Sequence, residues 1–210
     1  MTEAGDALLA GLNVSRETLA ALRAFEALVQ RWNPAINLVS KASLVDLWPR
    51  HILDSAQVFA LCPDPAATWV DVGSGGGFPG LVVAILAREL KPDLHVTLVE
   101  SDLRKATFLR QAAQTLRLPA RVLSERIESL APLAADVFSA RALAPLQDLL
   151  AYAERHMAPT GAAILPKGAR YADELASAKA SWRFDVDVRP SLSDAEAAIL
   201  VIRNIHRVHD

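Results

Sequence analysis

A glycine-rich loop between an apolar stretch and a helical stretch constrains the fold of this chain more than any other feature. Residues 69–72 are apolar except for Asp71, residues 73–80 contain five glycines, and the pattern from Pro79 to about Leu90 is helical. Glycine allows backbone dihedrals and close approaches that a side chain would block. At a strand-to-helix turn, backbone N–H groups and the helix N-terminus face a ligand. These residues therefore predict an α/β sheet with a ligand site at its first crossover.

Strand and helix patterns continue to alternate after this loop. A second strand is expected over residues 95–100, and Ser101 or Asp102 should cap a helix that runs to about Leu116. Such alternation implies right-handed crossovers and a largely parallel sheet. Further strands are expected over residues 120–123, 137–140 and 162–165, with a helix over 146–157 between the last two.

The end of the chain breaks this alternation. A helical pattern over residues 171–182 is followed by a strand pattern over 184–189, a polar connector over 190–196 and a last strand pattern over 198–205. Two strands without a helix between them favour an antiparallel hairpin. The expected fold class is therefore α/β, with a mostly parallel, Rossmann-like sheet that ends in a C-terminal antiparallel hairpin.

The N-terminal residues have helical patterns of their own. Residues 15–32 repeat apolar side chains at three- and four-residue steps, and the pair Asn33-Pro34 should stop that helix. A second, shorter helix is expected over residues 44–61. Because nothing resembling a linker follows, residues 1–66 are expected to form a helical cap on a single compact domain of residues 67–210.

Composition and charge narrow the class of protein. The 210 residues are 52% hydrophobic, yet the longest purely apolar run, residues 81–87, is far shorter than the roughly 20 residues of a membrane-spanning helix. Residues 1–13 lack a secretory signal pattern, and Cys62 is the single cysteine, which excludes an internal disulfide. A cytoplasmic protein without a metal site or a membrane partner is expected. The net charge of −2 means that any RNA binding must come from a local basic face.

Two carboxylates near the loop indicate what it binds. Gly75, Gly77 and Gly80 fit the dinucleotide fingerprint, so the loop alone leaves a nicotinamide cofactor open. Asp71 in the first strand would repel a diphosphate, whereas it favours the ammonium and sulfonium of S-adenosylmethionine. Glu100, which ends the second strand, can accept hydrogen bonds from ribose hydroxyls. The competing interpretation is that Asp71 caps the turn and Glu100 caps the next helix.

Several motifs together resemble one family. The matching segments are Asn37–Ser40, Arg50–Ser55, Asp71–Gly80, Phe108–Arg110, Ser139–Ala142 and Lys167-Gly168, in this order and spacing. They are similar to the 16S ribosomal RNA guanine-N7 methyltransferase G family, also called glucose-inhibited division protein B. The resemblance covers nearly the whole chain, and its Arg-His-Ile-Leu-Asp-Ser and glycine-loop motifs are specific. Two departures are Glu100, where Asp is frequent, and Leu103, which replaces a glycine.

The resemblance implies a class I methyltransferase fold, a monomer without an obligate protein partner, S-adenosylmethionine as methyl donor, and 16S rRNA or the 30S subunit as substrate. Position by position, it places the cofactor contacts on Gly73, Phe78, Ile127, Glu128 and Arg141, with Glu100 on the ribose. Together with the loop residues argued above, the expected cofactor-binding set is Asp71, Gly73, Gly75, Phe78, Glu100, Ile127, Glu128 and Arg141. Without the resemblance, Glu128 is a loop residue of no distinction and Phe78 could simply pack the core.

The chemistry of the implied reaction needs no general base. Guanine N7 has an in-plane lone pair and carries no proton, so catalysis rests on alignment and electrostatics. Arg141, at the end of the fourth strand, is the candidate for positioning the cofactor or the guanine, because a guanidinium fork suits a carboxylate or guanine O6. Its alternative role is a surface salt bridge.

RNA contacts are expected from Arg50, His51 and Lys167. The cluster of Arg50, His51 and Asp54 could equally be an internal ion pair that ties the cap to the core, and Lys167 could be a solvated lysine. Three other functions stay open: a small-molecule methyltransferase, a nicotinamide-dependent oxidoreductase, and a non-catalytic rRNA-binding assembly factor.

Overall fold

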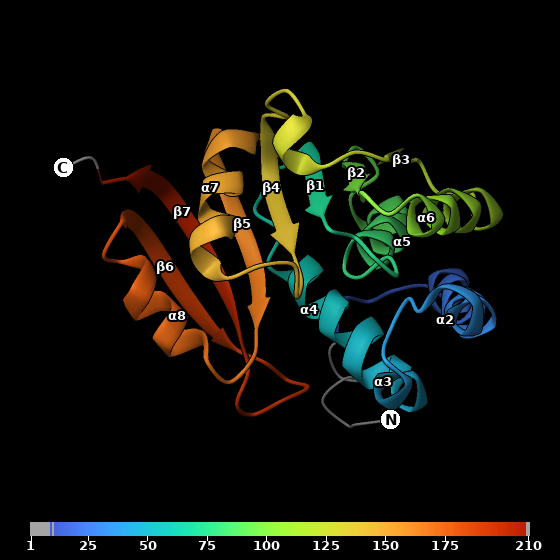
Figure 1. Cartoon of the computed structure of the whole chain (residues 1–210). Helices are drawn as coiled ribbons and strands as arrows, with labels where there is room; N and C mark the ends of the chain where they lie inside the picture. The colour runs from blue at the N-terminus through green and yellow to red at the C-terminus, as the bar shows by residue number, and fades with distance from the viewer. Residues whose placement is uncertain (1–8, 10, 209–210) are drawn as a thin grey trace.

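A seven-stranded sheet forms the centre of the computed structural model, which describes residues 9 and 11–208. The strand order is β3-β2-β1-β4-β5-β7-β6, in which β1 to β5 are parallel and β7 runs antiparallel to both neighbours (Figure 1). The expected α/β sheet with a C-terminal antiparallel hairpin is therefore confirmed. The strands are β1 (Thr68–Val72), β2 (His95–Val99), β3 (Ala120–Leu123), β4 (Ala135–Ala140), β5 (Met157–Lys167), β6 (Trp182–Pro190) and β7 (Ala198–Arg207).

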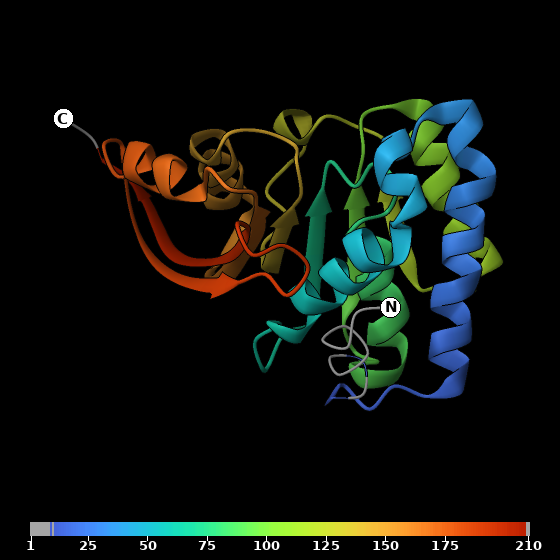
Figure 2. The same cartoon turned by 90° about the horizontal axis from the view of Figure 1, so that it is seen from below.

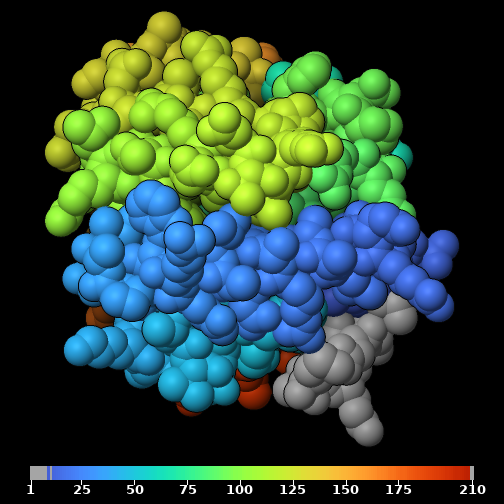
Figure 3. Space-filling model, turned by 90° about the vertical axis from the view of Figure 1, so that its right-hand side faces the viewer, coloured from blue at the N-terminus to red at the C-terminus, as the bar shows by residue number. Residues whose placement is uncertain are grey.

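Helices cover both faces of the sheet. One face carries α4 (Asp54–Ala60), α5 (Gly80–Leu90) and α6 (Leu103–Thr115), and the other carries α7 (Leu146–His156) and α8 (Tyr171–Ala178). The long helix α2 (Arg16–Ile36) packs outside α5 and α6, as a view from below shows (Figure 2). The space-filling view shows α2 as a continuous band across this side of the molecule (Figure 3).

The helix α2 continues through the proline that was expected to stop it. Pro34 lies inside the last turn, where its missing N–H forfeits a single hydrogen bond. The helix ends at Asn37, which has a φ of 50° and donates its N–H to the Asn33 carbonyl at 3.0 Å. The Asn33 side chain accepts the N–H of Val39 at 2.8 Å. These hydrogen bonds pair polar groups at the C-terminal end of α2, which lies three residues beyond the expected stop.

The helical stretch expected over residues 44–61 is confirmed at residues 44–45 and 47–60, but it is divided into three pieces. They are α3 (Lys41–Val45), the π-helical turn η1 (Trp48–Leu53) and α4. Ser40 caps α3 by accepting the N–H of Ser43 at 3.2 Å. Pro49 lies at the start of η1, where it cannot donate to a carbonyl of the preceding turn. Single π-helical turns occur often at functional sites, and η1 contains Arg50 and His51.

Two apolar cores flank the sheet. The larger core joins side chains of α2 and η1, such as Leu22, Phe25 and Trp48, to Trp69 and Leu98 in the sheet. The smaller core lies under α7 and α8. The N-terminal helices therefore share a core with the sheet, while the boundary predicted at residue 66 stays a prediction. The first eight residues and residue 10 of the expected cap lie outside the described residues.

Candidate functional site

The glycine loop folds back over the carboxyl ends of β1 and β2. The N–H groups of Gly73 and Ser74 both donate to the Val99 carbonyl, at 2.9 and 3.1 Å. Gly73, Gly75 and Gly77 have φ values of 66°, 52° and 88°. Only glycine adopts this left-handed region without steric cost, so the loop conformation explains its composition.

Asp71 lies beneath the loop and not in contact with a ligand space. Its side chain is fully buried, and its carboxylate accepts the Ser139 hydroxyl at 2.7 Å and the Gly80 N–H at 3.1 Å. Burial raises the pKa of Asp71 to about 6, although these hydrogen bonds and the charge of Arg141 act in the opposite direction. The expected direct contact between Asp71 and a cofactor is therefore corrected. Asp71 holds the loop on the sheet, and its capping interpretation was the better one.

Glu100 ties two segments together at the end of β2. Its carboxylate accepts the Gly75 N–H at 2.8 Å and the Asp102 N–H at 2.8 Å. The cap of α6 is Asp102, which accepts the N–H groups of Arg104 and Lys105. Glu100 lies where a ribose ligand is expected, and the same carboxylate also fixes the loop.

A small groove, here called the loop groove, opens between the glycine loop and β3. Its volume is about 180 Å³. Ile127 is buried in the short 3₁₀ turn η2 (Ile127–Ser129), and Glu128 accepts the Tyr152 hydroxyl at 2.7 Å. The lining includes Val72, Gly73, Val99, Ser101, Ile127, Glu128, Leu143, Ala144 and Tyr152. The structure thus brings Gly73 together with Ile127 and Glu128, as expected.

A second and larger hollow, the large cavity, lies on the other side of the loop after β4. Its volume is about 1170 Å³. Four segments far apart in the sequence line it: η1 and α4, the loop after β4, the loop after β5, and the connector between β6 and β7. Its polar lining includes Arg50, His51, Asp54, Arg141, Lys167, Asp173, Glu174, Ser191 and Ser193. All three predicted RNA-binding residues line this cavity.

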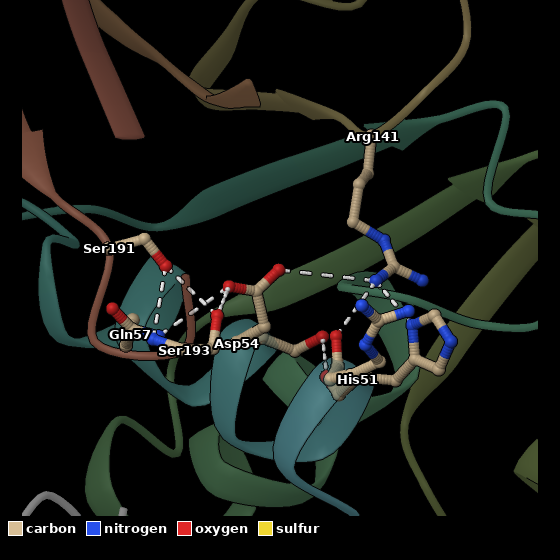
Figure 4. A network of polar contacts seen from close by, with 8 residues as sticks. His51, Asp54, Gln57, Arg141, Ser191 and Ser193 are labelled. Atoms are coloured by element: carbon tan, nitrogen blue, oxygen red, sulfur yellow. Dashed lines mark hydrogen bonds and ion pairs between the residues drawn. The ribbon is translucent and has the colours of Figure 1, made fainter. Parts of the chain in front are cut away.

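Arg141 is the centre of a polar cluster at the inner wall of the large cavity (Figure 4). Its Nη1 donates to His51 Nδ1 at 2.5 Å and to the Arg50 carbonyl at 3.4 Å, and lies 4.0 Å from Asp54 Oδ2. Arg141 comes from the end of β4, whereas its partners come from η1 and α4. The alternative role of a surface salt bridge does not describe Arg141, because its ion pair with Asp54 is mostly buried, with side chains 19% and 16% exposed.

His51 is neutral in this cluster. Burial first, and then the charges of Arg141 and Arg50, lower the pKa of His51 to about 3. Since Nδ1 accepts from Arg141, the ring proton is assigned to Nε2, which is buried without a partner among the described residues. A neutral acceptor beside Arg141 lets the guanidinium stay charged without repulsion.

Phe78 packs under the cluster instead of lining either hollow. Its ring stacks on His51 at a centroid distance of 4.9 Å and contacts Phe25 at 5.1 Å. The Arg141 guanidinium lies 5.2 Å from its centroid. Phe78 is 3% exposed. The core-packing interpretation of Phe78 therefore describes the structure, and a direct cofactor contact does not.

Lys167 links the loop after β4 to the helix α8. Its ammonium donates to the Ala144 carbonyl at 3.1 Å and to the Glu174 carboxylate at 2.7 Å, and its side chain is 9% exposed. Glu174 also accepts the Leu146 N–H at 2.8 Å. The expected RNA phosphate would have to compete with this ion pair. The solvated-lysine alternative is wrong, whereas Arg50 does expose its side chain.

Sequence reasoning did not single out several residues that the structure places at the site. Ser139 accepts the Trp69 indole N–H at 2.8 Å and donates to Asp71. Leu143 and Ala144 line both the loop groove and the large cavity. Ser193 donates to Asp54 Oδ1 at 2.9 Å from the far end of the chain. Only Ser139 belonged to a quoted motif; the others had no local signal.

The described part of the chain contains neither a membrane-spanning helix nor a metal-binding cluster. Over residues 9 and 11–208, no helix is both long and apolar enough to cross a membrane. The same residues contain no group of three or more His, Cys, Asp or Glu side chains arranged to hold a metal ion.

Several solved methyltransferases share this fold. An SAH-bound methyltransferase from Podospora anserina is 13% identical, with a TM-score of 0.63 over 96% of this chain and 95% of that one. A SAM-dependent methyltransferase from Aquifex aeolicus is 14% identical, with a TM-score of 0.58 over 78% of this chain and 97% of that one. The chain thus has the class I methyltransferase fold.

The family is shown by closer relatives. A model of the rRNA small subunit methyltransferase G family matches residues 18–201. The protein named ribosomal RNA small subunit methyltransferase G from Cereibacter sphaeroides is 50% identical over 99% of this chain and 100% of its own length. The protein of the same name from Ruegeria pomeroyi is 54% identical over 94% of this chain and 96% of its own length. The chain belongs to the rRNA small subunit methyltransferase G family.

Proposed function

We propose that this protein transfers a methyl group from S-adenosylmethionine to N7 of one guanine in 16S ribosomal RNA. The observation that carries the proposal is a pair of hollows that meet at one segment. The loop groove and the large cavity share Leu143 and Ala144 in the loop after β4. Ligands of open α/β sheets bind beyond the carboxyl ends of the strands, where the strand order reverses. Here β1 and β4 are the neighbours at that reversal.

The loop groove suits the methyl donor chemically. Gly73 lines it with backbone, Ile127 offers an apolar surface, and Glu128 supplies a carboxylate. Its volume of about 180 Å³ is smaller than the roughly 300 Å³ at which ligand pockets begin. Leu143 is the obstacle, because an added Cβ on Gly73 would lie 2.6 Å from its Cδ1. The proposal therefore requires that this side chain turns away when the donor binds.

When bound, S-adenosylmethionine supplies an electrophilic methyl group on a sulfonium. The chain's own residues then have to position the base and exclude water. No proton leaves N7, so no side chain has to accept one. His51 could not do so near neutral pH, because Arg141 occupies its Nδ1 and its pKa is about 3. Arg141 orients the base by hydrogen bonding.

The large cavity suits a nucleotide taken out of an RNA loop. Its volume of about 1170 Å³ exceeds the upper range of drug-sized pockets, about 1,000 Å³, and leaves room for a base with its sugar and phosphates. Proteins recognise RNA sequence mostly in unstacked loops, whose bases enter pockets. Arg50 at the cavity rim is placed to meet a phosphate. The substrate is the rRNA or the 30S subunit, and the protein acts as a cytoplasmic monomer.

The test is methyl transfer from labelled S-adenosylmethionine to purified 30S subunits from cells that lack this protein. Mass mapping of the 16S rRNA should find one N7-methylguanosine. Free 16S rRNA and free nucleosides are compared in parallel. Transfer to nucleosides alone would indicate a small-molecule methyltransferase, and rRNA binding without transfer would indicate an assembly factor. Thermal stabilisation by NAD(H) but not by S-adenosylhomocysteine would overturn the choice of cofactor.

A further inference from the structure

We propose that Asp54 and Arg141 recognise the guanine edge together: Arg141 donates to O6, and Asp54 accepts from N1–H and the 2-amino group. This inference rests on the proposed function and names the residues that select the base. It assigns to Asp54 a ligand role that the internal ion-pair interpretation does not contain. The two side chains face the large cavity from different elements, β4 and α4 (Figure 4).

Arg141 keeps donors free for a ligand. Its Nη1 makes both of its recorded hydrogen bonds, to His51 and to the Arg50 carbonyl. Over the described residues, Nε and Nη2 of Arg141 have no recorded hydrogen bond, and neither is among the enclosed polar atoms without a partner. These N–H groups therefore reach the cavity. An arginine donor to guanine O6 is the commonest base-specific contact of this side chain.

Asp54 is held in place with one oxygen directed at Arg141. Its Oδ1 accepts the Ser193 hydroxyl at 2.9 Å, while Oδ2 lies 4.0 Å from Arg141 Nη1, too far for a hydrogen bond. Gln57 secures the connector that carries Ser193, because its Oε1 accepts the Leu192 N–H at 2.7 Å. The Asp54 side chain is 16% exposed. The Asp54 carboxylate is mostly buried and lies near the Arg141 guanidinium without a hydrogen bond to it. It can therefore accept a hydrogen bond from a ligand.

The order of charges on the protein matches the order of groups on guanine. Along one side of this base lie the N7 lone pair, the O6 acceptor, the N1–H donor and the 2-amino donor. Arg141 is two residues from Leu143, which lines both hollows, and its Nη1 lies 4.0 Å from Asp54 Oδ2. A guanine with N7 toward the loop groove then meets a cation at O6 and an anion at N1–H. Adenine has an N7 as well, but it presents a donor to Arg141 and an acceptor to Asp54, so it is rejected.

Asp54 also contributes to the reaction itself. As the methyl carbon leaves sulfur and bonds to N7, the positive charge passes from the sulfonium to the purine ring, and no proton is released. The N1–H becomes a stronger donor as this charge develops. A carboxylate on N1–H therefore binds the transition state more tightly than the ground state. The nearby Arg141 is balanced by Asp54, so the pair presents no net charge to the cationic product.

The test changes one functional group of the RNA base and one side chain of the protein. The 30S subunits are reconstituted with 16S rRNA that carries guanosine, inosine or adenosine at the position mapped above. Inosine lacks only the 2-amino group. Single-turnover methyl transfer at saturating S-adenosylmethionine is measured for the wild type, Asp54→Asn and the matched control Asp93→Asn. Asp93 is exposed in the turn before β2 and lines neither hollow.

The wild type and Asp93→Asn should methylate guanosine about 10-fold or more faster than inosine, as expected for one hydrogen bond to a charged group. Asp54→Asn should be slower with guanosine and should treat the two bases within about 2-fold of each other. Adenosine should be rejected at least 100-fold by the wild type. Calorimetric binding of S-adenosylhomocysteine and the melting temperature verify folding. Should Asp54→Asn not fold, Ser193→Ala should lower the guanosine-to-inosine ratio to about 3.

The inference is overturned if the wild type does not distinguish inosine, or if a folded Asp54 or Ser193 variant keeps the full ratio. These failures differ from a failure of the proposed function. In that case the wild type would transfer no methyl group to guanosine-containing subunits at all.

Discussion

The loop groove and the large cavity are neighbours, but they are built from different materials. The loop groove is lined by the glycine loop and by short segments that follow β2, β3 and β4, with Tyr152 from α7. Two carboxylates, Asp71 and Glu100, hold the glycine loop by accepting backbone N–H groups. The large cavity has a more highly charged lining from distant segments, joined by Arg141, His51 and Asp54. The glycine loop beside the loop groove can be predicted from local sequence, whereas the polar cluster of the large cavity depends on the tertiary fold.

The largest expected effect tests whether Arg141 contacts the target guanine and not the cofactor. Arg141→Lys keeps the charge and removes the planar fork with its free N–H groups. We expect single-turnover methyl transfer to 30S subunits to fall about 100-fold, the usual cost of one positioned transition-state donor. The affinity for S-adenosylhomocysteine, measured by calorimetry, should stay within about 3-fold.

Arg203→Lys is the matched control, because Arg203 is exposed on β7 and has no recorded partner within the described ranges. It should retain wild-type rates. An equal loss of affinity for S-adenosylhomocysteine in Arg141→Lys would instead show that Arg141 contacts the cofactor, as the family resemblance implies.

The second prediction concerns the neutral state of His51. Because its folded pKa of about 3 lies below the unfolded value of 6.5, the unfolded chain takes up a proton first as the pH falls. The free energy of unfolding should therefore decrease from pH 7 to pH 5, by at most about 2 kcal/mol from this group. His51→Gln should lose less over the same interval in urea titrations. Equal losses in the two proteins would show that His51 titrates normally.

The third prediction separates the groove from the loop that forms it. Gly73→Ala and Gly75→Ala both force alanine into a left-handed backbone, at a cost of about 1–2 kcal/mol each. The added Cβ meets Leu143 at 2.6 Å in the first variant, but in the second its nearest neighbour is a backbone oxygen at 3.7 Å. We expect Gly73→Ala to bind S-adenosylhomocysteine about 10-fold more weakly than Gly75→Ala, with similar melting temperatures. Equal affinities would place the donor elsewhere.

The smallest expected effect distinguishes Arg50, which is expected to contact RNA, from Lys167, which has a structural role at the same cavity. Arg50→Gln should weaken binding to 30S subunits a few-fold and reduce the slope of log affinity against log salt by about 0.7 to 0.9, as for one lost phosphate contact. Lys167→Gln should leave that slope unchanged and lower stability by about 1 kcal/mol, because Glu174 loses its cation. Filter binding between 50 and 200 mM salt would show the reverse pattern if Lys167 contacts the RNA.

Most of the fold follows from local patterns. Apolar alternation and turn residues located all seven strands, and the helix starts at Asp102 and Leu146 agree with the structure. Patterns were less exact in the N-terminal helices. Pro34 is tolerated because the neighbouring Asn33 and Asn37 close the helix end, and the helical stretch expected over residues 44–61 is divided because it contains a π-helical turn.

The candidate site divides in the same way. The glycine loop could be predicted because its positive φ angles demand glycine, whatever packs around it. The partners of Lys167 could not, because Ala144 and Glu174 reach it only through the packing of α8. A fully buried Asp71 is likewise indistinguishable in sequence from one that faces a ligand. Burial, which the local sequence does not encode, decides between these roles.

The shared wall of Leu143 and Ala144 has a thermodynamic consequence. Under the proposed function, seating the donor displaces Leu143 from Gly73. Because the same backbone segment begins at Arg141, we expect the occupancy of one hollow to reshape the other. Reciprocity then requires that bound cofactor changes the affinity for the ribosomal subunit by the same factor by which the subunit changes the affinity for the cofactor. Titrating each ligand in the presence and absence of the other measures that factor twice, and a value of one would mean that the wall is rigid.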